Sequence, residues 1–320
     1  MKSFGRAMLD IILVNWNSGR QLLDAVVSII NHHAGVVGKV IVVDNNSTDG
    51  SLDVLKQQLP NVPFCVQFVE NSFNKGFGAA CNQGARLCGS GYLLFLNPDA
   101  RLFAGSLVAP LAYIQQPENM DVGICGVQLI DEDQEVARSC ARFPSAAAFA
   151  LEAVGLSKLR GLRSLGHHMS EWRHTTTRQV DHVIGAFYLV RRPLFEALNG
   201  FDERFFVYLE DLDLSLRARR AGWRCIYYAG AQAFHAGGGT SRQVKATRLF
   251  YSLRSRLLYG FKHFSLPQAW AVLGVTLLLE PVSRFFLSLL KGSLGDARDT
   301  LRGYVMLWRA LPGIIGSAQR

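Results

Sequence analysis

Short apolar or β-branched runs alternate with longer segments of helical spacing through the first half of the chain. The runs predict strands at 11–14, 40–43, 64–69, 92–96 and 122–127. Parallel strands joined by helical crossovers give a sheet with helices on its faces, so this order predicts an α/β fold. A further strand over 183–190 leads into a short helix that ends at Asn199-Gly200.

Polar clusters follow three of these strands directly. They are Asn17-Ser18-Gly19, the run from Asp44 to Gly50, and Asn97-Pro98-Asp99. In open parallel sheets ligands bind at the carboxyl ends of the strands, so these clusters are candidate site loops. The alternative is that they supply only turn and helix N-cap chemistry.

The periodic pattern is lost between residues 140 and 180, where Ala, Arg and His are frequent and Gly occurs at 155, 161 and 166. Such an insert is typical of a lid, a binding loop or a mobile segment. The pattern returns with a helix that begins at Glu210-Asp211 and ends at Gly222. Asp213 and Arg217 lie four residues apart on one face of this helix.

Composition and motifs exclude several classes of protein. With 49% hydrophobic and 18% charged residues in 320, the chain is too apolar for disorder. The six cysteines lack metal or disulfide spacing, which indicates reduced thiols in a cytosolic protein. The chain has no GxxxxGK[ST], no GxGxxG after the first strand and no GxSxG, which disfavours P-loop NTPases, Rossmann dehydrogenases and α/β-hydrolases.

The net charge of +9 lies entirely in the last quarter of the chain, where 12 Lys and Arg residues from Arg242 onward face 3 acids. We therefore expect an N-terminal α/β domain over 1–241 and a basic, apolar helical tail over 242–320. Nucleic-acid binding would also explain the charge, but no RNA- or DNA-binding signature accompanies it, so we expect no nucleic-acid partner.

Within the tail, residues 269–290 are long enough to cross a bilayer. Leu, Val and Phe favour insertion by about 0.3 to 0.6 kcal/mol each, whereas Glu280 and Arg284 oppose it by about 2.5 to 3.5 kcal/mol each, so the sum is near zero. Pro281 is expected to break the helix. With basic Arg254, Arg256 and Lys262 nearby, the tail is expected to lie on the membrane surface. The alternatives are that the tail packs on the N-terminal domain or forms a homodimer interface.

Five motifs in order carry a family resemblance. They are Val14-Asn15-Trp16-Asn17, Val43-Asp44 through Gly50, Asn74-Lys75-Gly76-Phe77-Gly78, Asn97-Pro98-Asp99, and Glu210-Asp211-Leu212-Asp213-Leu214. Together they resemble the family 2 inverting glycosyltransferases of the GT-A fold, in the rhamnosyltransferase-like branch that extends polyprenyl-diphosphate-linked sugars. The resemblance covers about residues 9 to 263.

The resemblance implies a nucleotide-sugar donor, with dTDP or UDP as the nucleotide. Asp44 would accept a hydrogen bond from N3–H of a pyrimidine base; a local capping acid is the alternative. The other positions that match nucleotide-contacting loops are Asn15, Asn17, Asn46, Asn74, Lys75, Gly76 and Asn97. Lys75 has an alternative as a solvated surface charge.

The resemblance also implies a Mg²⁺ or Mn²⁺ site. Asp99 matches the last acid of the family's DxD motif, and Asn97 stands where the first Asp often is. His235, before three glycines, matches a histidine that relatives present to the metal. One carboxylate does not hold a divalent cation unaided, so the donor diphosphate is expected to complete the site.

Asp211 matches the catalytic acid of the family and is the expected general base. The alternative is that an acid here only complements the helix dipole. Glu210 and Gly185 are expected acceptor contacts, and Asp213 is expected to pair with Arg217. No position resembles the carboxylate nucleophile that a retaining enzyme needs.

The resemblance implies an enzyme that moves one sugar, L-rhamnose from dTDP-rhamnose, to a lipid-linked or nascent glycan acceptor. Its expected place is cytoplasmic, peripheral to the inner face of the cell membrane. Two alternatives stay open: a hexosyl- or galactofuranosyltransferase that uses a UDP-sugar, and a catalytically inactive nucleotide-sugar- or glycan-binding membrane subunit.

Overall fold

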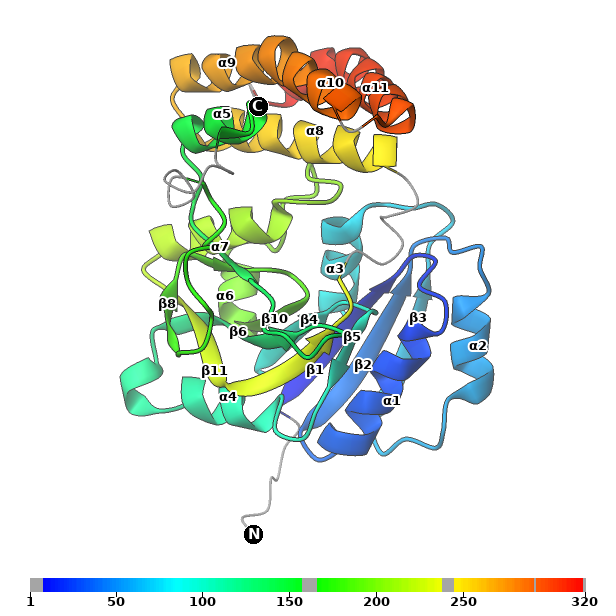
Figure 1. Cartoon of the computed structure of the whole chain (residues 1–320). Coiled ribbons are helices and arrows are strands. Elements are labelled where there is room, and N and C mark those ends of the chain that lie inside the picture. Colours follow the sequence, from blue (N-terminus) through cyan, green and yellow to red (C-terminus); the bar gives the residue numbers. More distant parts are fainter. Residues whose placement is uncertain (1–7, 157–165, 238–244, 291, 319–320) are drawn as a thin grey trace. The chain divides into compact units, whose positions relative to one another are not determined.

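The computed structural model describes residues 8–156, 166–237, 245–290 and 292–318, which form two compact units (Figure 1). The sheet unit comprises Met1–Ala141, Trp172–Glu203 and Glu210–Thr240, and the helical unit comprises Arg142–Glu171, Arg204–Leu209 and Ser241–Arg320. Parts of the expected mobile insert and of the boundary before the tail, residues 157–165 and 238–244, lie outside the described residues, as do Gly161, Gly238 and Gly239.

The sheet unit contains a nine-stranded mixed sheet in the order β3-β2-β1-β4-β10-β6-β11-β5, with β8 paired to β11. Its strands are β1 (Leu9–Asn15), β2 (Val37–Asp44), β3 (Cys65–Glu70), β4 (Tyr92–Leu96), β5 (Ala100–Leu102), β6 (Val122–Ile130), β8 (Arg178–Val180), β10 (Phe187–Arg191) and β11 (Arg224–His235). The short β7 (Cys140–Ala141) and β9 (His182–Val183) form a separate two-stranded sheet.

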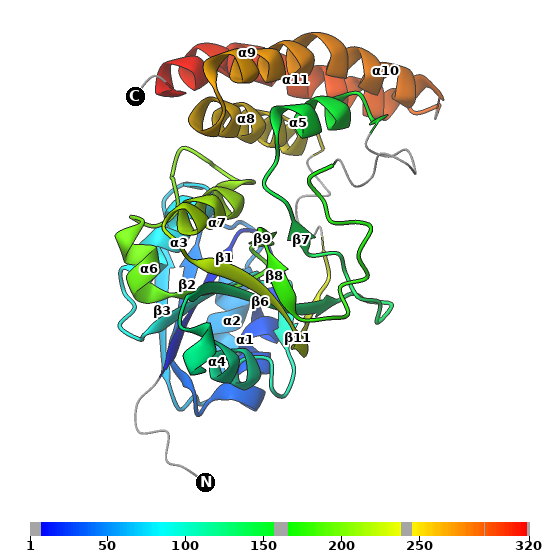
Figure 2. The same cartoon turned by 90° about the vertical axis from the view of Figure 1, so that its left-hand side faces the viewer.

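The helices of this unit cover both faces of the sheet. They are α1 (Gln21–His33), α2 (Ser51–Gln58), α3 (Phe77–Ala85), α4 (Val108–Ile114), the short 3₁₀ turn η1 (Pro117–Asn119), α6 (Arg192–Ala197) and α7 (Glu210–Arg220). Figures 1 and 2 show α1 and α2 on one face and α3 and α6 on the other.

The alternation of side chains along β1 decides which helix covers which face. Ile11 and Leu13 belong to the buried cluster that includes the apolar face of α1. Ile12 points the other way, toward α3, where a Cβ on Gly84 would lie 2.6 Å from Ile12 Cγ2. Only glycine fits at this crossing, so α3 packs close against the sheet.

The expected α/β architecture is confirmed, and the strand at 92–96 has the predicted bounds. The strand predicted over 183–190 is divided: His182–Val183 belongs to β9, and β10 begins at Phe187. β10 runs antiparallel to both β4 and β6, so it interrupts the parallel order that the alternating pattern indicates.

The helical unit consists of α5 (Ala146–Ala153), α8 (Lys245–His263), α9 (Leu266–Gly274), the π-helical segment η5 (Val275–Leu279), α10 (Glu280–Leu290) and α11 (Leu294–Ala318). The expectation that Pro281 breaks the tail helix is wrong. Because a π-helical turn comes directly before the proline, the missing N–H is accommodated and α9, η5 and α10 run on as one helix.

The charges of the tail also differ from the expectation. Glu280 is fully buried and accepts hydrogen bonds from Arg256 Nη1 at 2.5 Å and Arg284 Nε at 2.9 Å. Counting Glu280 and Arg284 as separate unpaired charges therefore overstates their cost in a membrane. Arg254 donates to the carbonyl of Arg204 and Arg256 is buried, so both side chains have partners within their own unit.

Candidate active site

Asn15 and Asp44 meet where β1 and β2 end. Asn15 Nδ2 donates to Asp44 Oδ1 at 2.7 Å, and the amide of Ser47 donates to Asp44 Oδ2 at 2.9 Å. The Ser47 contact is the local capping role named as the alternative. Each carboxylate oxygen has a second lone pair, so this role leaves Asp44 able to accept from a base as well.

Asn17 and Asn46 hold turns beside Asp44. Both adopt positive φ angles, 52° and 63°, a conformation that asparagine tolerates better than most residues. Asn17 Oδ1 accepts from the amide of Thr48 at 2.7 Å and so ties the loop after β1 to the loop after β2. Asn46 exposes its side chain to solvent.

Asn45 has a role that the sequence analysis did not assign. Its buried side chain donates to the carbonyl of Gly76 at 3.1 Å and accepts from Asn71 Nδ2 at 2.9 Å. Asn74 Oδ1 accepts from the Gly76 amide at 2.9 Å, so this loop is held from both sides. Lys75 projects over the ring of Phe73, 5.8 Å from the ring centroid.

Asp99 and His235 come together because β5 and β11 pair antiparallel, with His235 opposite Ala100. Asp99 Oδ1 lies 3.3 Å from His235 Nε2. The register depends on an irregularity in β11: Tyr228 pairs with Val127 of β6, whereas Gln232 pairs with the next residue, Gln128. Three extra residues of β11 therefore lie between these two pairs.

The two side chains fit a metal ion. Neighbouring ligand atoms of an octahedral ion with bonds of about 2.1 Å lie about 3 Å apart, close to the separation of Asp99 Oδ1 and His235 Nε2. In the described part of the chain, no group of three or more His, Cys, Asp or Glu side chains forms a metal cluster. That the donor diphosphate completes the site stays a prediction.

Asp211 lies at the start of α7 and is held by backbone amides. Its Oδ2 accepts from the Gly185 amide at 2.7 Å and its Oδ1 from the Leu212 amide at 2.8 Å. A Cβ at Gly185 would lie 3.1 Å from Asp211 Oδ2, so glycine permits this approach. The expected acceptor contact of Gly185 stays a prediction.

His182 is the second functional residue that the sequence patterns missed, and its Nε2 lies 3.5 Å from Asp211 Oδ2. Burial raises the pKa of the Asp211 carboxyl, whereas the His182 imidazole lowers it. The two backbone amides lower it further, and the net effect is a pKa below the usual value. Asp211 is therefore a carboxylate at neutral pH.

Glu210 differs sharply from its neighbour. Its side chain is buried, and burial together with the charge of Asp211 raises the pKa of Glu210 well above the usual value. Among the described residues its Oε2 finds no hydrogen-bond partner. Its acceptor contact stays a prediction. The expected pair of Asp213 with Arg217 is confirmed, with Oδ2 2.8 Å from Nε.

Backbone hydrogen bonds connect the three groups of residues at one edge of the sheet. The amide of Asn97, two residues before Asp99, donates to the carbonyl of Ala186, next to the glycine that holds Asp211. β4, which ends just before Asn97, pairs with β1, which ends at Asn15 beside Asp44. The candidate base, metal ligands and nucleotide contacts therefore share this edge.

The family model described as "Glycosyltransferase like family 2" matches residues 7–257. The chain belongs to this family. It is 29% identical over 233 residues to the N-acetylglucosaminyl-diphospho-decaprenol L-rhamnosyltransferase of Mycobacterium tuberculosis, which covers 69% of this chain and 73% of that protein. It is also 29% identical over 170 residues to rhamnosyltransferase WbbL of Escherichia coli K12, over 52% of this chain and 61% of that protein.

Solved structures agree on the fold of this glycosyltransferase. The mannosyltransferase PcManGT of Pyrobaculum calidifontis, in complex with GDP-Man and Mn²⁺, matches with a TM-score of 0.54 and 16% identity over 99% of this chain and 87% of that one. GalNAc-T7 with UDP, GalNAc and Mn²⁺ matches with a TM-score of 0.56 and 14% identity over 84% and 52%. The expected GT-A fold is confirmed.

Proposed function

We propose that this glycosyltransferase moves one L-rhamnose, with inversion, from dTDP-rhamnose to a lipid-linked saccharide in cell-surface polysaccharide synthesis. The observation that carries the proposal is the shared edge where ionised Asp211, the Asp99–His235 pair and Asp44 lie. The donor sugar and the lipid-linked acceptor are supported by the relatives named as rhamnosyltransferases, one of them for a decaprenol-linked substrate.

Asp211 acts as the general base in this proposal. Its carboxylate takes the proton of the acceptor hydroxyl while that oxygen attacks the anomeric carbon, on the face opposite the nucleotide. The bond from the anomeric carbon to the phosphate oxygen breaks, and the nucleotide diphosphate leaves with the electron pair. Because the pKa of Asp211 is lowered, the side chain is ionised at neutral pH and is able to accept this proton.

Asp99 and His235 would hold the divalent cation, which when bound supplies positive charge at the departing diphosphate. The carboxylate and imidazole donors suit Mn²⁺, and the carboxylate also suits Mg²⁺. Asp44 would accept from N3–H of the thymine base. The loop that Asn45 holds, with Lys75 and Gly76, would contact the nucleotide.

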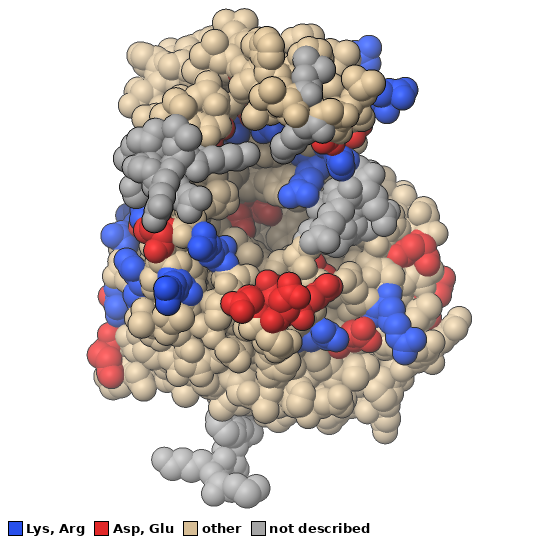
Figure 3. Space-filling view, viewed as in Figure 1, with Lys and Arg blue, Asp and Glu red and all other residues tan. Residues whose placement is uncertain are grey.

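We further propose that the helical unit rests on the membrane through an apolar surface. Among the described residues, one helix, Leu266–Ser288, is long and apolar enough to cross a bilayer by length and composition. Its outward side chains and those of α11 are strongly exposed, and Figure 3 shows few charges on this unit in that view. The exposed apolar side chains of this surface include Leu278, Leu279, Phe286, Leu290, Leu294, Leu301 and Trp308.

Basic side chains accompany this apolar surface. Arg298, Arg302 and Arg309 of α11 are exposed beside Leu301 and Trp308. Exposed Arg and Trp next to apolar side chains are typical of a helix in the interface of an anionic membrane. In this proposal α11 contributes to the attraction, in addition to the expected basic group of Arg254, Arg256 and Lys262.

The donor assignment is tested with a panel of nucleotide sugars in a thermal-shift assay, with and without Mn²⁺. At 100 times its dissociation constant, a ligand stabilises the folded protein by about 2.7 kcal/mol, which raises the melting temperature by several degrees. We expect the largest shift with dTDP-rhamnose and Mn²⁺ together. A larger shift with UDP-galactofuranose or a UDP-hexose would replace dTDP-rhamnose as the donor.

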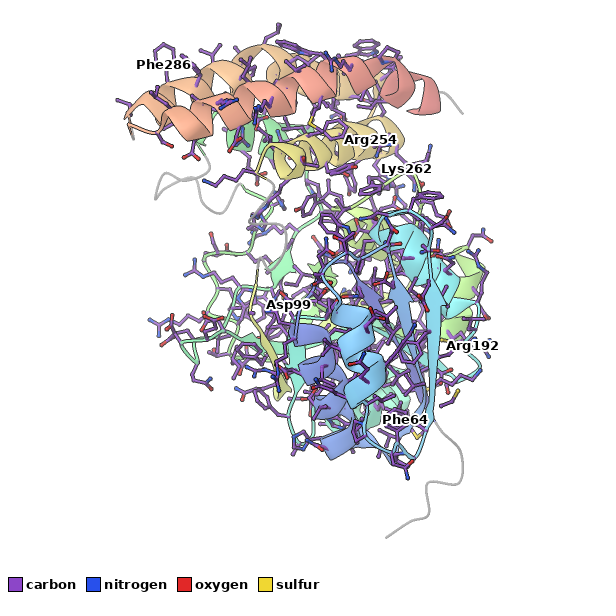
Figure 4. The ribbon with its side chains drawn as sticks, turned by 90° about the vertical axis from the view of Figure 1, so that its right-hand side faces the viewer. Phe64, Asp99, Arg192, Arg254, Lys262 and Phe286 are labelled. Atoms are coloured by element: carbon purple, nitrogen blue, oxygen red, sulfur yellow. The ribbon has the colours of Figure 1, made fainter. Side chains whose placement is uncertain are left out.

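The membrane proposal predicts that Phe286→Glu with Leu290→Glu will lower binding to anionic liposomes by about tenfold or more. Phe286, which points away from α8 in Figure 4, and Leu290 are 61% and 83% exposed, so the change should spare the fold. Burial of one such side chain contributes about 1.5 to 3 kcal/mol, and 1.4 kcal/mol is a tenfold change in affinity. Liposome co-sedimentation measures the loss.

Met120→Glu is the matched control, because Met120 is 57% exposed but lies in the sheet unit. It should bind liposomes as the wild type does, and wild-type binding should weaken as salt screens the arginines. Equal binding by the wild type and the double variant would contradict a lipid role and leave packing or dimerisation as the use of this surface.

A further inference from the structure

His182 contacts Asp211 and belongs to a buried series of polar side chains that have no role in the proposed reaction. The imidazole is 3% exposed, with Nε2 toward Asp211 Oδ2 at 3.5 Å and Nδ1 toward Ser215 Oγ at 3.0 Å. Ser215 Oγ lies 2.9 Å from the hydroxyl of Tyr188, which is itself completely buried.

This chain of contacts has two consistent directions. In one, Tyr188 donates to Ser215, Ser215 donates to Nδ1, and Nε2–H of the neutral imidazole donates to Asp211. In the other, the imidazolium donates from both nitrogens and both hydroxyls turn around. Tyr188 then donates to the backbone carbonyl of Asp211, at 3.5 Å. In both of these arrangements Nε2–H lies toward the Asp211 carboxylate.

The other ionisable groups described near Asp211 are mainly carboxyl, thiol and phenol groups, which carry no positive charge. On α7, burial and the charges of Asp211 and Asp213 raise the pKa of Glu210, and Asp213 is paired with Arg217. Three further groups nearby are buried: Cys81 of α3, Tyr188 of β10 and Cys225 of β11. Burial raises the pKa of each well above its usual value, and the charges of Glu210 and Asp211 also raise that of Cys81. Among the described residues, His182 of β9 is thus the side chain whose N–H lies next to Asp211 Oδ2.

We propose that His182, supported by Ser215, is a positioning residue that keeps the Asp211 carboxyl ionised and aimed by donating Nε2–H to Oδ2. The proposal rests on Asp211 as the base of the proposed reaction. The proton that Asp211 takes from the acceptor stays on Asp211 until product leaves. His182 itself touches no substrate in this scheme.

The test is the pH dependence of kcat/KM for sugar transfer in His182→Phe and His182→Gln. Phenylalanine fills the space but removes the donor, so the pKa of Asp211 should rise. The acid limb should then move to higher pH by about one unit, which is a tenfold loss below the limb. Glutamine places a neutral N–H near the position of Nε2 and should give a smaller shift. The KM for the donor should stay unchanged in both variants.

His33→Gln is the matched control. His33 is another buried histidine of the sheet unit, and its Nε2 contacts the carbonyl of Phe103 at 2.9 Å. This variant should cost stability without moving the acid limb. An unmoved limb in both His182 variants would overturn the proposal. Should His182→Phe fail to fold, His182→Gln together with Ser215→Ala, which removes the support of Nδ1, decides the same point.

A double-variant cycle separates this proposal from the proposed function. In an Asp211→Asn background, His182→Gln should have no further effect on residual transfer, because no carboxyl is left to ionise. Full turnover by Asp211→Asn alone would overturn Asp211 as the base. A low turnover for Asp211→Asn with a wild-type acid limb in the His182 variants would overturn only the role of His182.

Discussion

Asp211→Asn should lower sugar transfer by about 10²- to 10⁴-fold and leave donor affinity nearly unchanged. The loss is the contribution of a general base, which acts on the acceptor hydroxyl rather than on the donor. The amide keeps the shape of the side chain but does not take a proton. Steady-state transfer assays and donor titrations of the same preparation measure the two quantities.

Asp213→Asn, one half-turn along the same helix, should show the opposite profile. Asp213 is fully buried and paired with Arg217, which also donates to the carbonyls of Leu198 and Gly200. Removing one partner of such a pair costs roughly 3 to 5 kcal/mol of stability. We therefore expect a lower melting temperature and near-native kcat for the folded fraction. Near-native turnover by Asp211→Asn would reduce Asp211 to a helix-capping acid.

Asp99→Ala should abolish the metal dependence of donor binding. Loss of a residue that only supports a metal ligand lowers the affinity for the metal by about 10- to 100-fold. Loss of a carboxylate ligand itself should therefore lower the affinity for Mn²⁺ by at least about 100-fold. His235→Ala should cost less, about tenfold, because Asp99 and the diphosphate would still ligate the ion. Titration of the donor at several Mn²⁺ concentrations measures both losses.

Asp53→Ala serves as the control, since Asp53 is an exposed acid on α2. It should bind donor and Mn²⁺ like the wild type. If EDTA leaves donor binding by the wild type unchanged, neither Asp99 nor His235 is a metal ligand, and their contact is only structural.

Local patterns predicted the features that depend on neighbours in sequence. The strand at Tyr92–Leu96 follows from a run of buried apolar residues. The pair of Asp213 with Arg217 follows from helical spacing. The polar residues after β1, β2 and β4 meet at one edge because parallel strands end together, as the order of the elements indicated.

Contacts between distant segments were outside the reach of these patterns. His182 sits in a two-residue strand, and its role depends on Asp211 and Ser215, 29 and 33 residues later. β10 lies antiparallel because it enters between β4 and β6, which no local periodicity records. The cost of Glu280 was misjudged because its partner Arg256 lies one helix earlier in the chain.

The three extra residues between Tyr228 and Gln232 of β11 have a consequence for protein engineering. Side chains alternate between the faces of a sheet, so an odd number of inserted residues decides which face His235 occupies. Ala229 is partly exposed and Gly230 is exposed, so both resemble loop positions at which a deletion is tolerated. Deleting one of them would turn the imidazole away from Asp99 although no site residue is changed. Libraries of deletion variants should therefore lose donor binding at this stretch while the protein still folds.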